Sequence, residues 1–163
     1  MVEAAQGEWL VIIGDDDRLL PDFVEKLMGC NQPGVSLFFS NHHLMDEHGQ
    51  RLEEATRQHT VAYARDQLPA GRLENPELWV WRNAVPISST LMRMADVRRL
   101  QFKEDLNTPE IELFLRLARE GAGFVFCPEY LMEYRTHPQS ATTSGLWGER
   151  LAEYLLPLET SAE

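Results

Sequence analysis

Three consecutive aspartates, Asp15, Asp16 and Asp17, follow Gly14 and an apolar run at residues 9–13. A short apolar run that ends at a turn residue is typical of a buried strand. In open α/β sheets, ligands bind at the carboxyl ends of strands, which is where these aspartates would lie. Divalent cations such as Mg²⁺ and Mn²⁺ prefer oxygen ligands, and one or two carboxylates with substrate phosphates are enough to bind them. The triplet therefore indicates a divalent-metal site at the end of a strand.

The same aspartates also have a structural interpretation. Pro21 suits the first turn of a helix whose apolar face would include Phe23 and Leu27, and Gly29 would end that helix. A carboxylate just before a helix accepts hydrogen bonds from its first backbone N–H groups, so Asp17 would then be a helix cap. Spacing alone does not choose between a cap and a metal ligand.

A second group of acids lies in the clearest predicted helix, at residues 108–120. Thr108 would cap this helix and Gly121 would follow its end. Glu110 and Glu112 fall in the first turn, where the helix dipole favours anions. The pattern alone explains these acids equally well by the dipole and by chemistry.

The elements that would position these residues alternate between strands and helices, which predicts an α/β fold. Further strands are expected at 35–40, at 88–93 and on both sides of Pro128, and further helices at 95–100 and 146–156. The polar stretch 41–54 is expected as a loop or hairpin, with His42 and His43 in solvent. Residues 53–75 show no clear pattern and no functional signal.

Composition limits the class of protein. The chain has 163 residues, which suits one domain or part of a larger one, and 44% of them are hydrophobic. Its net charge of −11 argues against a protein that wraps nucleic acid. Cys30 and Cys127 lack metal-ligand spacing, so a reduced, cytoplasmic compartment is expected. No apolar run approaches the ~18 residues of a membrane helix.

Three segments, taken in order, resemble family 2 glycosyltransferases, which have the GT-A fold. They are "GEWLVIIGDDDRLLPDFVEKL", "VPISSTLMRMADVRRLQFKEDL" and "PEIELFLRLAREGAGFVFCPEYLMEYRTHPQSAT". The resemblance spans about residues 3–143. It implies an incomplete GT-A fold, with a Rossmann-like mixed sheet flanked by helices. Residues 1–163 would form a single partial glycosyltransferase domain, with 145–163 as a C-terminal helix or tail.

The resemblance assigns a metal site to the aspartates. Alignment on Pro21 places the second Asp of the family's Asp-x-Asp motif on Asp16, the expected ligand of a Mn²⁺ or Mg²⁺ ion that bridges the donor diphosphate. The first Asp of the motif falls on Gly14, a departure, so Asp15 is expected to contact the donor ribose or the metal instead. Asp17 is expected either as a cap or as a further metal ligand. His137, in "YRTH", matches a histidine that adds to the metal or diphosphate site in some relatives.

The resemblance also assigns the catalytic base. Counting back from the "LRLA" helix, the base falls on Glu110, where the family usually has Asp, with Asp105 and Glu112 as alternates. Arg135 is expected to offset phosphate charge. Trp81 could stack on a sugar, although a tryptophan in such a stretch is more often a core or interface residue.

These assignments predict a metal-dependent inverting glycosyltransferase in glycan or polysaccharide biosynthesis. Its partners would be a nucleotide-sugar donor and a glycan or lipid-linked acceptor, with a peripheral position at the inner membrane face as one expected location. Family members begin with a nucleotide-binding half that this sequence lacks. The chain would therefore be a fragment that pairs with the missing half or with a second copy through an open strand edge. The alternative is a non-catalytic interaction module of glycosyltransferase origin.

Overall fold

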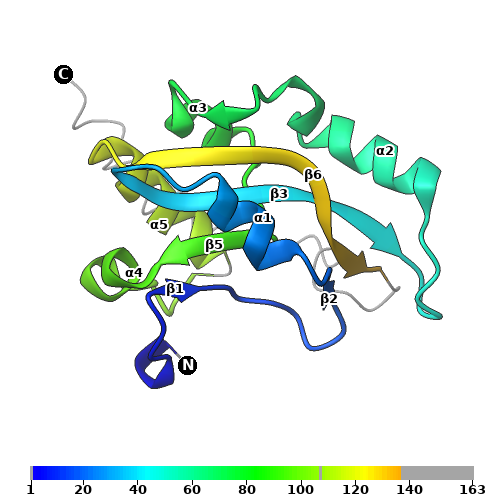
Figure 1. Cartoon of the computed structure of the whole chain (residues 1–163), viewed down its shortest axis with the longest axis horizontal. Coiled ribbons are helices and arrows are strands. Elements are labelled where there is room, and N and C mark those ends of the chain that lie inside the picture. The colour runs from blue at the N-terminus through cyan, green and yellow to red at the C-terminus, as the bar shows by residue number, and fades with distance from the viewer. Residues whose placement is uncertain (1, 107, 137–163) are drawn as a thin grey trace.

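The computed structural model describes residues 2–106 and 108–136, which fold into a mixed α/β structure (Figure 1). Within these residues, six strands form one sheet in the order β1-β5-β3-β6-β2, and β4 also pairs with β6. The strands are β1 (Trp9–Leu10), β2 (Arg18–Leu19), β3 (Val35–Met45), β4 (Gly71–Arg72), β5 (Thr90–Arg93) and β6 (Gly123–Arg135). The helices are α1 (Phe23–Gly29), α2 (Glu53–Ala62), α3 (Pro76–Trp81), α4 (Met94–Leu100) and α5 (Pro109–Arg119), with 3₁₀ turns η1 (Val2–Ala4) and η2 (Arg65–Gln67). The α/β class predicted from the sequence is confirmed.

The centre of the sheet is the parallel pair of β3 and β6. Strand β3 continues through residues 41–45, so the loop or hairpin predicted for the start of the polar stretch is wrong. Strand β6 is continuous across Pro128, where two separate strands were predicted. The register explains the proline: Ser40 faces Cys127 but Asn41 faces Tyr130, so two residues of β6 bulge out. The Asn41 side-chain amide donates to the Pro128 carbonyl at 3.0 Å and bridges this bulge.

One face of the sheet is covered by α1, which crosses in front of it in Figure 1. Phe23 and Leu27 are fully buried there against Phe38 of β3 and Val125 of β6. The helix begins at Phe23 rather than at Pro21, which lies in the preceding turn. Asp17 is therefore not its cap, because β2 lies between Asp17 and the helix.

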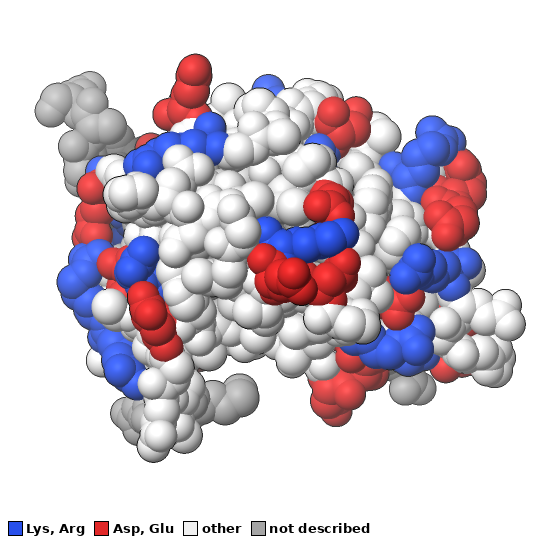
Figure 2. Space-filling view, viewed as in Figure 1, with Lys and Arg blue, Asp and Glu red and all other residues white. Residues whose placement is uncertain are grey.

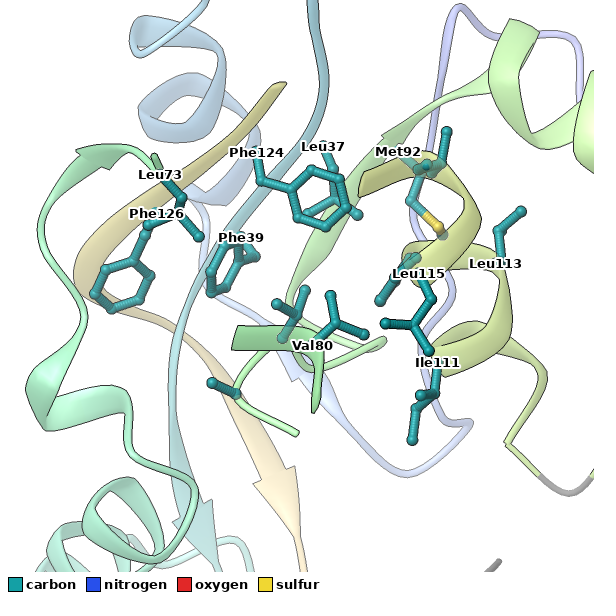
Figure 3. Close-up of a cluster of buried hydrophobic side chains, with 14 of the residues drawn as sticks. Leu37, Phe39, Leu73, Val80, Met92, Ile111, Leu113, Leu115, Phe124 and Phe126 are labelled. Atoms are coloured by element: carbon teal, nitrogen blue, oxygen red, sulfur yellow. The ribbon is translucent and has the colours of Figure 1, made fainter. Parts of the chain in front are cut away.

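The opposite face is covered by α3, α4 and α5, and it holds the larger apolar cluster (Figure 3). The rings of Phe39 and Phe124 extend from neighbouring strands toward Val80 of α3 and the leucines of α5. The Phe126 ring lies beside Phe39, with their centroids 5.1 Å apart. Helix α5 agrees with its prediction to within one residue at each end. It ends before Gly121, whose φ of +83° favours glycine.

The strand directions place three carboxyl ends at one end of the sheet. Strands β1 and β3 both pair antiparallel with β5 and so run in the same direction, and β6 is parallel to β3. Residues 11–17 leave β1 at one edge of the sheet and reach β2, which pairs with the last part of β6 at the other edge (Figure 1). The aspartates thus lie at the carboxyl ends of β3 and β6. Strand β1 itself is a short, half-buried edge strand rather than the buried strand predicted at residues 9–13.

Charges on the surface form small mixed groups. On the face that carries α1, acidic and basic side chains lie next to each other, separated by uncharged surface (Figure 2). Lys26 of α1, for example, pairs with both Asp22 and Glu129. Among the described residues, no helix is long and apolar enough to cross a bilayer.

Candidate functional site

The aspartate corner, residues 14–17, brings two carboxylates to one small space. A Cβ atom placed on Gly14 would lie 2.9 Å from Oδ2 of Asp17 and 3.2 Å from Oδ1 of Asp16. A larger side chain at this position would therefore force at least the Asp17 carboxylate to move. Asp15 is exposed on the same turn. Gly14 therefore leaves room for the carboxylates of Asp16 and Asp17 beside the turn.

Asp17 is held in place by the end of β6. Its Oδ1 accepts a hydrogen bond from the backbone N–H of Arg135 at 2.8 Å, and its own N–H donates to the Gly14 carbonyl at 3.3 Å. Burial raises the pKa of the Asp17 carboxyl, the bond from Arg135 opposes this, and the nearby Asp16 carboxylate raises the pKa further. Two carboxylates that repel each other in this way are a favourable environment for a cation.

Arg135 fastens the aspartate corner to the turn that follows β3. Its Nε donates to the Asp16 carbonyl at 2.9 Å, and its Nη1 donates to the carbonyls of Asp46 and Glu47 at 2.8 and 2.9 Å. The guanidinium thus joins two backbone segments. The phosphate contact predicted for Arg135 remains a prediction.

Glu110 lines a cavity of about 320 Å³ at the same end of the sheet. The walls come from α2 and η2, from residues 83–88, and from the ends of β3 and β6. Burial raises the pKa of the Glu110 carboxyl, while a hydrogen bond from its own backbone N–H opposes the shift. A carboxyl with a raised pKa that faces a cavity has the properties of a general base.

The two alternates for the base occupy different surroundings. Glu112 is only 3% exposed, and its two carboxylate oxygens lie 2.7 Å from Nε and Nη2 of Arg116. Arg116 also donates to the carbonyls of Leu100 and Gln101, so this ion pair joins α5 to the end of α4. Asp105 is exposed before α5. Of the three acids, only Glu110 lines the cavity.

The last residues of β6 connect the cavity to the aspartate corner. Tyr134 and Thr136 line the cavity, and Arg135 between them contacts the corner. The structure therefore brings Asp16, Asp17 and Glu110 to one end of the sheet, on either side of one strand end. These are the residues that the sequence singled out as metal ligands and base.

Other predicted site residues lie elsewhere. Trp81 is 41% exposed on α3 and its Nε1 donates to Glu77 of the same helix at 3.2 Å. It does not line the cavity around Glu110. His137 lies outside the described residues, as does the helix predicted at 146–156.

Sequence reasoning missed three polar residues of the cavity, His42, His59 and Arg65. The prediction that His42 is solvated is wrong, because His42 is 4% exposed. His43 is half-buried, and its ring stacks on Tyr130 with their centroids 4.7 Å apart. Strand β3 continues through both residues and carries His42 into the interior. His59 and Arg65 come from the stretch in which no pattern was found. Burial is predicted from the spacing of hydrophobic residues, and these two polar residues do not belong to such a pattern.

A divalent cation fits the aspartate corner on its donor chemistry. Asp16 and Asp17 provide two convergent carboxylate oxygens, which is the usual protein share of a site completed by substrate phosphates. Among residues 2–106 and 108–136, no group of three or more His, Cys, Asp or Glu side chains could hold a metal by itself. No protein-family model matches this chain, and no curated protein sequence matches it. The glycosyltransferase resemblance therefore stays a prediction.

Proposed function

We propose that the chain is the metal-and-acceptor part of a GT-A-type, inverting glycosyltransferase that uses Mn²⁺ or Mg²⁺. One observation carries the proposal. Two carboxylates beside Gly14 and a half-buried acid in a cavity lie on either side of the end of β6. A glycosyl transfer from a nucleotide diphosphate needs both features, a site for the diphosphate and a base for the acceptor hydroxyl.

In this proposal, Asp16 and Asp17 hold the cation and Glu110 acts on the acceptor. A bound divalent cation supplies positive charge to the diphosphate leaving group. Glu110 accepts the proton of an acceptor hydroxyl, and that oxygen forms a bond to the anomeric carbon. The bond from this carbon to the diphosphate oxygen breaks, and its electron pair leaves with the nucleoside diphosphate. Attack from the face opposite the leaving group inverts the configuration, as in a single displacement at a glycosidic carbon.

Thermal unfolding tests the metal site directly. We expect Mn²⁺ and a nucleoside diphosphate (UDP, GDP, CDP or TDP), added together, to raise the Tm more than either ligand alone, because ligands that bind only the folded state stabilise it. Gly14→Ala should abolish the joint shift, since its Cβ would displace the carboxylates of Asp16 and Asp17. Gly29→Ala is the matched control, because a Cβ there meets nothing within 4 Å. A cooperatively melting chain that shows no joint shift would refute the metal site.

The alternative, a non-catalytic interaction module, is favoured by one observation. In the described part of the chain, β1 pairs only with β5, so its other edge has no strand partner. An unpaired edge is a template for another strand. A module predicts that Asp16→Ala with Asp17→Ala leaves partner binding intact and that no nucleotide changes the Tm. The thermal experiment therefore separates the two functions.

A further inference from the structure

The cavity that contains Glu110 also contains a buried cation. Arg65, which begins η2, is 3% exposed and lines this cavity. Its Nη2 donates to Nδ1 of His59 at 2.7 Å and makes a longer contact of 3.5 Å with Nε2 of His42. Its guanidinium carbon lies 5.3 Å from the centroid of the Tyr63 ring. Every one of these partners is an uncharged ring at neutral pH, because burial and the Arg65 charge lower the pKa of both histidines.

No carboxylate neutralises Arg65 within the described part of the chain. Among residues 2–106 and 108–136, no Asp or Glu side chain forms an ion pair with its guanidinium, although Glu110 lines the same cavity. Burial lowers the pKa of Arg65 to about 10, so the group stays charged at neutral pH. A buried charge without a counter-ion is destabilising, and proteins seldom retain one without a use for it.

Two buried side-chain nitrogens of residues that line the cavity have no hydrogen-bond partner within the described part of the chain. Nε of Arg65 is buried and has no partner among the described residues, and the same holds for Nδ1 of His42. Because a guanidinium only donates, a hydrogen bond from Arg65 to Nε2 of His42 would leave the proton of the neutral ring on Nδ1. An oxyanion in the cavity would provide acceptors for the Arg65 guanidinium, which lines it.

The cavity has room for such a ligand. Its volume of about 320 Å³ lies at the lower end of the range of small-molecule sites, which suits a ligand of monosaccharide size. Glu110 faces the same space without pairing with Arg65, so the cavity offers a carboxyl group and a separate cation to one ligand. A ligand with a hydroxyl group near Glu110 and an anionic group near Arg65 would complement the two side chains.

We propose that Arg65 and His42 bind a carboxylate or phosphate group carried by the acceptor, so that the acceptor is a sugar acid or a sugar phosphate with a free hydroxyl directed to Glu110. The contacts around Arg65 support the proposed oxyanion site. Its assignment to the acceptor rests on the proposed glycosyltransferase function. The anion would fix the orientation of the acceptor and thereby select which hydroxyl meets the base.

Side-chain NMR of the whole chain tests the anion site without metal or nucleotide. The probes are glucuronate, glucose 6-phosphate and glucose, titrated against the ¹H–¹⁵N resonance of Arg65 Nε. We expect a saturable shift with at least one charged sugar and binding about tenfold or more weaker with glucose, because hydrogen bonds to charged groups contribute that much. If neither charged sugar shifts the resonance, or if glucose binds equally well, the proposal is wrong.

A pair of variants makes the assignment specific. Arg65→Gln should remove the preference for a charged sugar over glucose. Arg57→Gln is the matched control, since Arg57 is exposed on α2, pairs with Glu54 and lies outside this cavity. Retention of the preference in Arg65→Gln would overturn the role of Arg65. If that variant does not fold, the titration of the unchanged protein decides by itself.

The outcome is independent of the test of the proposed function. A chain that binds glucuronate or glucose 6-phosphate but shows no joint shift with Mn²⁺ and nucleotide keeps the anion site and loses the transferase. A chain that shows the joint shift but binds neither charged sugar would support the proposed transferase and exclude the anionic acceptor.

Discussion

At the scale of single residues, the cavity depends on uncharged imidazoles. His59 accepts a hydrogen bond from Arg65, which requires its Nδ1 to be unprotonated. Burial, together with the Arg65 charge, lowers the pKa of His59 from 6.5 to about 4. A histidine whose pKa is lowered by folding stabilises the folded protein above pH 6.5, and this contribution is lost as the pH falls toward 4.

We therefore expect the free energy of unfolding to fall between pH 6.5 and 4, with His59 contributing on the order of 1–2 kcal/mol once solvent screening of this half-buried ring is allowed for. His59→Gln should reduce this dependence, because Gln retains an acceptor for Arg65 and does not titrate. It should not remove it, since the buried His42 also has a lowered pKa. Urea unfolding at a series of pH values measures the effect. The exposed His48→Gln should leave the profile unchanged, and an equal change in both variants would contradict the assignment to His59.

At the scale of elements, helix α2 shows why part of the fold escaped prediction. Its described buried positions are Thr56 and Thr60 rather than aliphatic residues, so the stretch has no hydrophobic period. Thr56 instead accepts a hydrogen bond from the Leu44 N–H of β3 at 2.8 Å through its Oγ1. The helix is held to the sheet by a specific polar contact, which residue type alone does not reveal.

Strands β3 and β6 illustrate the same limit. Asn41 and His42 read as loop residues, yet pairing with β6 buries them. Pro128 reads as a break, yet the bulge tolerates it. By contrast, α4, α5 and β5 were predictable, because each has an apolar pattern or clear boundary residues. The same contrast holds for the candidate site. The sequence singled out Asp16, Asp17 and Glu110 as candidates, but it did not single out Arg65, because the contacts of Arg65 form only in the tertiary structure.

The contact between α2 and β3 leads to a matched pair of substitutions. Thr56→Val should lower the free energy of unfolding by about 1–3 kcal/mol, because the buried Leu44 N–H loses its acceptor. Thr60→Val should cost less, since its hydroxyl donates to the Thr56 carbonyl within the helix at 2.9 Å and its other contact, Tyr130, is only part-buried. Urea unfolding measures both. Equal losses in the two variants would show that the helix is held by packing rather than by this bond.

At the scale of the whole molecule, the two apolar clusters share the same strands. Strand β3 directs Phe38 to the α1 face and Phe39 to the α5 face, and β6 likewise divides Val125 from Phe124. Both clusters therefore depend on the central β3–β6 pair. We expect the described chain to unfold as one cooperative unit, so the proposed cation and anion sites should be lost in the same transition.

Leu27→Ala and Leu113→Ala test whether the chain unfolds cooperatively, because each leucine is fully buried in a different apolar cluster. Each substitution should lower the free energy of unfolding by about 2–5 kcal/mol. In both variants the transitions followed by tryptophan fluorescence and by far-ultraviolet circular dichroism should coincide. If Leu27→Ala instead releases α1 in a separate early transition, the face that carries α1 is an independent layer. The aspartate corner, which leads into α1 through β2, would then need a partner to hold its carboxylates, and the interaction-module alternative would gain support over catalysis by this chain alone.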